Sequence, residues 1–375
     1  MSGTYNIPFF GVDRQYANLR EEILDVSDRV YSTGMVLDGP HTQFFNQSIA
    51  KMTERKYAIS VNSGTQALVF ALRSLDGCSP IVYPSDKILI PSQSFVATVN
   101  AVYEAGFTPV FCDVDSRTGL MDLNKIPVEV NEIRALMYVN LFGNVIDYDK
   151  LTVYREIWAE NNVPIIEDAA QSLGAYYRGH PSGKLGDISC LSFDPTKNLN
   201  NYGSGGMILT DDYATWEYCE GLRNNGKHLG HDFYGTNARM SEADCAQMLV
   251  KLKYFDEWQE RRAHIAEYYI GELMEYVDVI QPGIGVESAW HKFVIRLSER
   301  HALKHHLAIK GIETRYHYDK PLFELPVGWD FVDYAKDPYR GAVSFSRECL
   351  SLPIYPEMTD SEVTYVIESI LEFLR

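Results

Sequence analysis

Strand–helix alternation between residues 57 and 210 constrains the fold more than any other feature of the chain. Helix-length stretches, as at 65–75, 95–105 and 148–160, separate several short apolar runs. The runs are YAISV (57–61), ILI (88–90), PVFCDV (109–114), ALMYVNL (135–141), PIIEDA (164–169), SCLSF (189–193) and GMILT (206–210). Such alternation builds βαβ units, and near-continuous apolar strands are typical of a sheet covered on both faces. The sequence therefore predicts an α/β domain with a mostly parallel sheet.

The pattern changes after residue 210. Residues 242–273 carry apolar side chains near helical spacing and predict one long helix. Short strands and short helices follow, with strands expected at 277–281 and 291–297. We expect residues 1–245 to form an N-terminal segment and a large α/β domain, and residues 246–375 to form a linking helix and a smaller C-terminal α+β domain.

The last segment of the chain has the clearest helix signal. Thr359 and Glu362 have the spacing of a capping box, in which each side chain caps the backbone of the other. An apolar stripe follows at Val363, Val366, Ile367, Ile370, Leu371 and Leu374. A stripe of this kind predicts a structural helix that packs on the core.

Charge narrows the choice of partners. The chain has 375 residues, with 34 Lys and Arg against 51 Asp and Glu, a formal net charge of −17. This argues against a nucleic-acid partner, which needs a basic patch, although a local site can still bind a phosphorylated small ligand. No apolar run approaches the roughly 20 residues of a membrane span, and the N-terminal residues lack signal-peptide features. We expect a cytoplasmic protein with no membrane partner.

Cysteine spacing gives no sign of a metal or redox site. The six cysteines are Cys78, Cys112, Cys190, Cys219, Cys245 and Cys349. None forms a C-x-x-C pair, which argues against zinc and thioredoxin-like sites. We expect reduced, mostly buried thiols and no bound metal.

Ser63, Gly64 and Thr65 lie between the strand at 57–61 and a helix expected to start near Gln66. Ligands of open α/β sheets bind beyond the carboxyl ends of the strands. A small turn at a helix N-terminus offers free backbone N–H groups to an anion, most often phosphate. A plain strand-to-helix turn with a Ser or Thr cap explains the same residues, so both interpretations stay open at this point.

Two charged residues follow later strands of the same predicted sheet. Asp168 ends the run at 164–169, where an unpaired carboxylate is costly, and a protonated heterocyclic nitrogen, a salt bridge or a helix cap would each serve as its partner. Lys197 follows the run at 189–193, where a lysine can have a depressed pKa and form a Schiff base, although most loop lysines are solvated. Together with the turn at Gly64, they predict a pyridoxal 5′-phosphate (PLP) site, because PLP must be held by its phosphate, ring nitrogen and aldehyde.

Longer motifs occur in order along nearly the whole chain. The densest is EDAAQSLGAYYRGHPSGKLGDISCLSFDPTKNLNNYGSGGMILTDD at 167–212. Others are IPFFGVDRQYANLREEI, VNSGTQAL, D-V-D-x-x-T-G at 113–119, LRNNG, GTNARMSEADCAQMLVKLKYFDEW and GIETRYHYDKPL. These motifs resemble the DegT/DnrJ/EryC1/StrS family of sugar aminotransferases, a branch of the fold-type-I PLP enzymes. The resemblance implies a fold-type-I aminotransferase with a large, mostly parallel-sheet domain and a smaller C-terminal α+β domain.

The resemblance assigns cofactor roles position by position. Lys197 matches the lysine that forms the internal aldimine with PLP and moves the proton. Asp168 matches the partner of the ring nitrogen, and Gln171 matches the residue beside the ring and its 3-hydroxyl. The other implied contacts within one chain, to the phosphate or by stacking on the ring, are Gly64, Thr65, Ser192 and Phe95.

Further positions concern the second subunit and the substrate. Asn237 matches an asparagine that reaches the cofactor phosphate of the neighbouring subunit, which implies a homodimer with shared active sites. His317 and Arg239 match positions near the substrate, although a surface histidine and a structural salt bridge are equally good explanations. Asp194 and Asn140 depart from the family pattern, which has an aromatic residue or His at the first and His at the second. Both departures are expected near the sugar.

The implied reaction moves an amino group from L-glutamate, or glutamine, to a keto sugar on a nucleoside diphosphate, by way of pyridoxamine phosphate. The DRQY and VNLFG motifs look more like those of family members that aminate C3 of a 3-keto sugar than of members that aminate C4. The expected acceptor is therefore a 3-keto-6-deoxy sugar. A 4-keto nucleotide sugar and a free cyclitol ketone stay open as alternatives. A dehydratase of the same fold is disfavoured, because those relatives replace the lysine with His, and a regulatory role is disfavoured by the intact Lys197 and Asp168.

Overall fold

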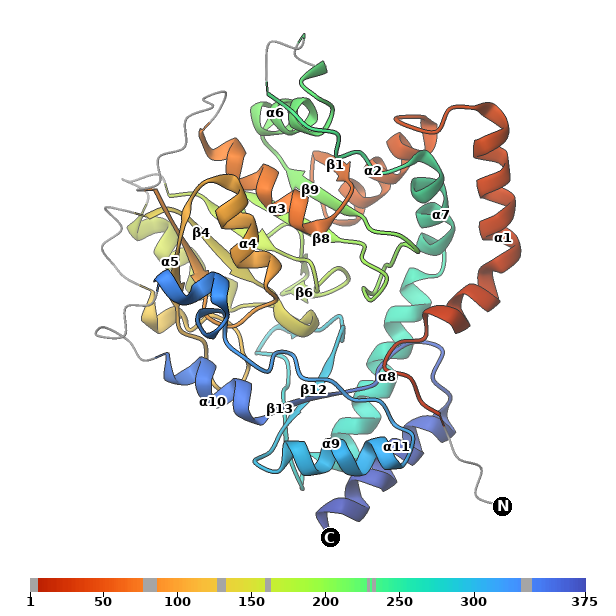
Figure 1. Ribbon diagram of the computed structural model, residues 1–375, viewed down its shortest axis with the longest axis vertical. Helices are drawn as coiled ribbons and strands as arrows, with labels where there is room; N and C mark the ends of the chain where they lie inside the picture. The colour runs from red at the N-terminus through yellow and green to blue at the C-terminus, as the bar shows by residue number, and fades with distance from the viewer. Residues whose placement is uncertain are drawn as a thin grey trace.

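A seven-stranded sheet forms the centre of the computed structural model, which describes residues 6–76, 86–126, 133–158, 163–227, 230, 234–331 and 339–375 (Figure 1). Its strand order is β1-β9-β8-β5-β4-β2-β3. The strands are β1 (Tyr57–Val61), β2 (Lys87–Pro91), β3 (Thr108–Cys112), β4 (Ile133–Val139), β5 (Ile165–Asp168), β8 (Ile188–Ser192) and β9 (Gly206–Thr210). Pairing is parallel from β3 to β8, and only β9 runs antiparallel to its neighbours β1 and β8. The predicted α/β class and mostly parallel sheet are confirmed.

Helices cover both faces of this sheet, because alternate strand residues point to opposite sides. On one face, α3 (Gly64–Arg73), α4 (Ala97–Ala105) and α6 (Tyr213–Arg223) pack on residues such as Ile59 and Met137. The other face is covered by α2 (Pro40–Met52) and α7 (Glu242–Leu252), which pack on Leu191 and Leu209, and by α5 (Tyr148–Ile157) further along. Two apolar layers therefore hold the strand ends in fixed positions.

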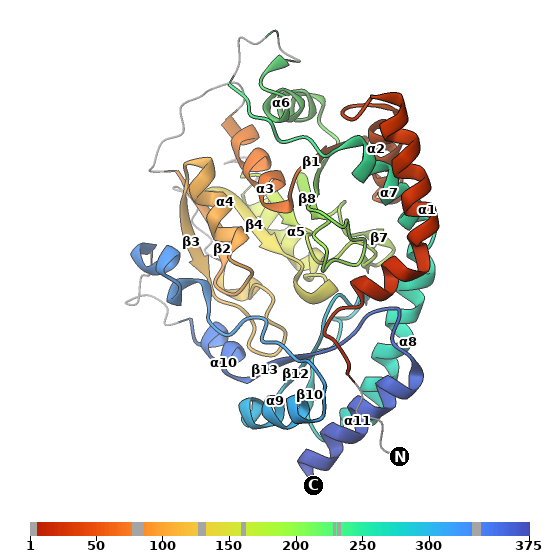
Figure 2. The ribbon, with the colours of Figure 1, turned by 45° about the vertical axis from the view of Figure 1, so that its right-hand side comes forward.

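The predicted helix over 242–273 is wrong as a single element. The structure has α7, then a turn at Lys253 and Tyr254, then α8 (Phe255–Leu273). The backbone N–H groups of both turn residues donate to carbonyls three residues back, to Val250 and Lys251. This tightening lets α7 pack beside α1 (Val12–Thr33) while α8 runs on toward the C-terminal part (Figure 2). A periodic apolar pattern cannot reveal such a change, because both helices bury a stripe with the same spacing.

The C-terminal part has its own small sheet and core. β12 (Phe293–Arg296) lies between β10 (Asp278–Val279) and β13 (Cys349–Leu352), antiparallel to both. α8, α9 (Arg300–Ile309) and α11 (Asp360–Leu374) bury apolar residues against this sheet. The capping box at Thr359 and Glu362 is confirmed at the start of α11.

The remaining elements are short. A second three-stranded sheet is formed by β11 (Val286–Glu287), β6 (Tyr176–Tyr177) and β7 (His180–Pro181). One more helix, α10 (Arg340–Glu348), precedes β13, and 3₁₀ helices occupy Ser74–Asp76, Leu123–Lys125, Leu141–Gly143, Leu322–Glu324 and Pro326–Phe331.

Two segments cross between the parts of the chain. Ile7 bridges to Ile312 and packs in the C-terminal core. Leu322 and Phe323 pack in the core of the large sheet, although both lie beyond residue 246. The predicted division at 245/246 stays a prediction, and these crossings fix how the C-terminal part sits over the sheet edge.

Five of the cysteines are free and buried, as expected, and Cys78 lies outside the described residues. Within the described ranges, no three His, Cys, Asp or Glu side chains gather as metal ligands would. No helix among the described residues combines the length and the apolar character that a membrane span requires.

Candidate active site

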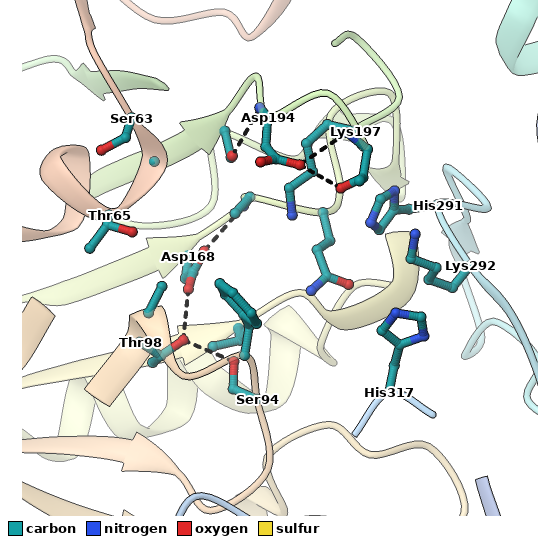
Figure 3. Close-up of a pocket in the computed structure, with 18 of the residues that line it drawn as sticks. Ser63, Thr65, Ser94, Thr98, Asp168, Asp194, Lys197, His291, Lys292 and His317 are labelled. Atoms are coloured by element: carbon teal, nitrogen blue, oxygen red, sulfur yellow. Dashed lines mark hydrogen bonds between the residues drawn. The ribbon is translucent and has the colours of Figure 1, made fainter. Parts of the chain in front are cut away.

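A cavity of about 310 Å³ opens at the carboxyl edge of the large sheet (Figure 3). Its walls come from the ends of β4, β5 and β8, the start of α3, and the C-terminal part of the chain. Nine of the twelve residues expected at the site line it: Gly64, Thr65, Phe95, Asp168, Gln171, Ser192, Asp194, Lys197 and His317. The topology thus brings together segments as far apart in the sequence as Gly64 and Lys197, because parallel strands end at one edge, and the C-terminal part adds His317.

The start of α3 forms one end of the cavity. The Ser63 side chain accepts the Gln66 N–H at 3.1 Å, so the predicted cap is present. The N–H groups of Gly64 and Thr65 belong to the first helical turn, which has no intrahelical acceptors. A Cβ on Gly64 would come within 2.7 Å of Ser192 Cβ, so only glycine lets β8 lie this close. Two free donors and a positive helix end therefore face the cavity, which suits an anion.

Asp168 lies at the end of β5 with 3% of its surface exposed. Its Oδ1 accepts the Ala170 N–H at 3.1 Å, and its Oδ2 accepts the Thr98 hydroxyl at 3.1 Å. The Thr98 and Ser94 hydroxyls are in turn 2.8 Å apart. Burial raises the pKa of Asp168, while the Ala170 N–H, the charge of Lys197 and Thr98 oppose that rise. Among the described residues, Lys197 is the cation whose charge acts on this carboxylate, and no ion pair joins the two, so a positive partner from outside the chain would stabilise it.

Lys197 lies in the loop after β8, and its side chain enters the same cavity (Figure 3). Its N–H donates to the Asp194 carbonyl at 2.9 Å. The Asp194 carboxylate accepts the Thr196 N–H at 3.0 Å and the Thr196 hydroxyl at 2.7 Å, which fixes the turn. Burial lowers the pKa of Lys197, and the charges of Asp168 and Asp194 limit the shift. A lysine of this kind is a better base and nucleophile than a solvated one.

Gln171 and Phe95 both contact Tyr318. Gln171 Oε1 accepts the Phe142 N–H at 2.9 Å, and its Nε2 donates to the Tyr318 hydroxyl at 3.1 Å. The Phe95 ring centroid is 5.8 Å from that of Tyr318, and half of Phe95 is exposed. Gln171 is thus held on both sides, which fixes its amide in the cavity wall.

Sequence reasoning missed several residues of this cavity. Thr98 carried no signal beyond its place in a helix. His291 and Lys292 line the wall opposite the start of α3, beside His317, whose Nδ1 is 2.8 Å from the Ser351 hydroxyl (Figure 3). Arg315 also lines the cavity. The pair His291-Lys292 directly before an apolar strand was the available signal, since charges at a strand end are often functional.

Three expected residues lie elsewhere. Asn237 is exposed, and its Oδ1 accepts from Arg239 at 3.3 Å, while Arg239 pairs with Asp38 at 3.3 Å. Their roles toward a second subunit or a substrate stay predictions. Asn140 does not line the cavity, because it is fully buried and its side chain donates to Glu167 at 2.8 Å. Its N–H donates to the Asp168 carbonyl at 3.1 Å, and its place near the sugar stays a prediction. A polar residue at a strand end can satisfy a buried carboxylate as well as a ligand.

Comparison with known proteins gives one family. A family model described as the DegT/DnrJ/EryC1/StrS aminotransferase family matches residues 17–371. The chain is 34% identical to a dTDP-3-amino-3,4,6-trideoxy-alpha-D-glucose transaminase of Streptomyces venezuelae, covering 99% of this chain and 97% of that protein. It is 33% identical to a protein of Geobacillus stearothermophilus named pleiotropic regulatory protein, covering 99% of both.

Solved structures agree with this assignment. The structure of S. venezuelae DesV, described as a complex with a ketimine intermediate, has a TM-score of 0.93 and 32% identity, covering 99% of each chain. Other neighbours include forms with bound pyridoxamine phosphate (PMP). A fold-type-I aminotransferase architecture is therefore confirmed.

The residues present fit the PLP on which aminotransferases of this family depend. The free N–H groups of Gly64 and Thr65 match a phosphate, and the unpaired carboxylate of Asp168 matches a protonated ring nitrogen. The Lys197 side chain enters the cavity beyond both, where an aldehyde would meet it. PLP would thus be held at three points along one cavity.

Proposed function

Because the chain belongs to the DegT/DnrJ/EryC1/StrS aminotransferase family, we propose that it uses PLP to move an amino group from L-glutamate, or glutamine, to a keto sugar carried on a nucleoside diphosphate. One observation carries this proposal. Lys197, Asp168 and the N-terminal turn of α3 face a single cavity, with the lysine pKa lowered and the carboxylate without an ion-pair partner among the described residues. A structural lysine or a structural aspartate would be paired within the chain.

Each residue has a distinct part in this chemistry. PLP supplies an electron sink for the negative charge that develops at the carbon losing its proton. Lys197 Nζ takes that proton and returns it to a neighbouring carbon, for which a neutral amine is needed. Asp168 holds a proton on the ring nitrogen beside it, since an anion there favours the charged form. Thr98 and the Ala170 N–H keep Asp168 ionised and oriented.

The acceptor is proposed to be a 3-keto-6-deoxy sugar. The name of the Streptomyces relative specifies a 3-amino sugar, and its similarity covers nearly the whole chain. Amination at C4 and amination of a free cyclitol ketone are the alternatives. Steady-state assays with 3-keto and 4-keto nucleotide sugars and a free keto cyclitol separate the three, and a clear preference for either alternative would overturn the choice of C3.

We further propose a homodimer with shared sites. Asn237 is exposed and lies outside its own cavity, and Phe95 is half exposed at the cavity mouth. A second copy would cover Phe95 and bring Asn237 to the opposite phosphate. Mixing Asn237→Ala with Lys197→Ala protein tests this, because shared sites give a heterodimer whose activity differs from that of either parent. No heterodimer, or no change in activity, would contradict the shared site.

The visible absorption spectrum tests the cofactor and the donor together. Purified protein with PLP should turn yellow as Lys197 links to the aldehyde, and L-glutamate should bleach the colour. Yellow protein that glutamate leaves unchanged keeps PLP and points to glutamine as donor. Colourless protein would refute the PLP site.

A further inference from the structure

Lys292 is a buried lysine in the cavity wall opposite the phosphate-binding end. It directly precedes β12, and its N–H donates to the Phe142 carbonyl at 3.1 Å. Only 6% of the residue is exposed. Figure 3 places its side chain beside His291 and His317, on the far side of Lys197 from Ser63 and Thr65. A ligand that reaches past Lys197 therefore meets this ammonium group.

No acidic side chain of the described chain pairs with Lys292. Its Nζ lies 4.2 Å from the ring centroid of Phe10 and 5.1 Å from that of Phe9, and the structure gives it no oxygen acceptor. Burial holds its pKa well below the usual range, and the charges of Lys197, Arg262 and Arg315 lower it further, with Asp194 opposing. A buried cation without an anion is costly unless a ligand supplies one.

A second buried lysine shows what a structural role looks like in this chain. Lys251 is fully buried, and its Nζ donates to the Asn200 carbonyl at 2.8 Å. The same atom lies 3.5 Å from the ring centroid of Tyr202. Lys251 is thus satisfied by the chain, whereas Lys292 faces a cavity with aromatic rings behind it.

The neighbours of Lys292 make this end of the cavity positive. Arg315 also lines the cavity, and its guanidinium lies 5.0 Å from the Phe10 ring. Its Nε and Nη2 donate to Glu313 Oε1, at 3.0 and 2.6 Å. The Nη1 side of the guanidinium is therefore left to bind a ligand. The two carboxylates of the cavity already accept other hydrogen bonds, Asp168 from the Thr98 hydroxyl and the Ala170 N–H, and Asp194 from the Thr196 N–H.

The position favours a carboxylate over a phosphate. Atoms that arrive beyond Lys197 are those close to the reacting carbon of a substrate. An amino-acid donor carries a carboxylate directly on that carbon, and a sugar acid carries one on its ring. The diphosphate of a nucleotide sugar is separated from the keto carbon by the sugar ring, and phosphate already has a site at the start of α3.

We propose that Lys292, assisted by Arg315, is a carboxylate-binding residue that seats an acidic group of a substrate next to the reacting carbon. This rests on the proposed function for the identity of the substrates. The amino-acid donor is the source that agrees with the 3-keto-6-deoxy acceptor proposed above, because a 6-deoxy sugar has no carboxylate. An acidic keto sugar is the other source, and it would replace that acceptor. Either way Lys292 sets substrate specificity and takes no part in the proton transfer of Lys197.

The test compares Lys292→Met, which keeps the stem that packs on Phe10, with Lys292→Arg, which keeps the charge. Lys253→Met serves as control, because Lys253 is exposed and pairs with Glu22 at 3.1 Å. In single-turnover bleaching with L-glutamate, Lys292→Met should weaken the apparent donor Kd by about 10-fold or more, the range for lost bonds to a charged group. The maximal bleaching rate should change little, and Lys292→Arg should recover most of the affinity.

A second arm identifies the source of the carboxylate. Unchanged donor binding, with a KM raised by about 10-fold only for a nucleotide-linked keto uronate, assigns the subsite to the sugar. Weakened donor binding, with neutral keto sugars unaffected, assigns it to the donor. Equal KM and Kd values for Lys292→Met and wild type in both assays would overturn the proposal.

A third measurement needs no turnover. Calorimetric titration with 2-oxoglutarate should show binding that Lys292→Met weakens and that falls as the pH rises, because a carboxylate stabilises the charged lysine. A merely structural role would lower the unfolding midpoint or the PLP content and leave this pH dependence unchanged. Loss of all colour and turnover in wild type would refute the proposed function, while Lys292-dependent binding of 2-oxoglutarate would still support the subsite.

Discussion

The two ends of the active-site cavity are built from different parts of the chain. The cofactor end, with Gly64, Asp168 and Lys197, comes from strand ends, and from the segments that follow them, in one mostly parallel sheet. The opposite end, with Lys292 and His317, comes from the small sheet and the loop after α9. Residues of the first kind can vary little, because a rigid sheet edge and one cofactor fix their geometry. Residues of the second kind are not fixed by the cofactor, so different side chains there can suit different substrates.

Substitution of Lys197 is expected to have the largest effect and to strike at the cofactor end alone. Lys197→Ala should lose about 10³-fold or more in both half-reactions, because the proton acceptor is gone. The protein should still bind PLP without the yellow linkage. Lys197→Arg serves as matched control, since it keeps the charge but has no neutral amine at any accessible pH. Turnover near the wild-type level in Lys197→Ala would sink the assignment.

Substitution of Asp168 tests whether the negative charge of this carboxylate is needed at the cofactor end. Asp168→Asn should lose about 10²-fold to 10³-fold, the range for removing one preorganised electrostatic partner. The ring nitrogen would no longer be held protonated, while the shape of the site is kept. Thr98→Val should have a smaller effect, because it removes only one 3.1 Å hydrogen bond to the carboxylate. We expect the activity to fall about 10-fold.

The pH dependence of the donor half-reaction shows in which direction Thr98 shifts the pKa of Asp168. Thr98 is among the groups that hold the pKa of Asp168 down against burial. Thr98→Val should therefore raise that pKa and move the acidic limb of the donor half-reaction toward higher pH. An unchanged limb, with lowered activity throughout, would mean that Thr98 only packs the wall.

Strand-end motifs explain why the sheet and the cofactor end were predictable. Gly64, Asp168 and Lys197 each sit within a few residues of a strand whose apolar run is plain in the sequence, so topology alone places them together. Lys292 and Arg315 do not follow strands of the large sheet, so the same rule could not place them at the cavity. These two residues reach the cavity only because α8 and the small sheet pack over the carboxyl edge of the large sheet. The break between α7 and α8 at Tyr254, which sets the direction of α8, cannot be predicted from the spacing of apolar residues. Asn140 shows the limit of this rule, because its side chain also follows a strand but donates to the buried Glu167 and does not line the cavity.

The smallest expected effect concerns stability and compares the two buried lysines. Burial lowers the pKa of Lys251 to about 7, partly opposed by Glu357. Below pH 7 the folded and unfolded chains both bind this proton, and above the unfolded value of 10.5 neither does. Between these limits the unfolded chain binds more protons, so the unfolding free energy due to Lys251 rises with pH.

Lys251→Met should remove this dependence without touching either end of the cavity. The difference in unfolding free energy, wild type minus Lys251→Met, should grow by up to about 1.4 kcal/mol per pH unit between pH 7 and 10. Denaturant unfolding at several pH values, in one cofactor state, measures it. A flat difference would mean that Lys251 stays charged on its Asn200 and Tyr202 contacts. In the same series, 2-oxoglutarate should stabilise wild type and Lys251→Met alike but Lys292→Met far less. Of these two lysines, Lys292 is the one proposed to bind a carboxylate from outside the chain.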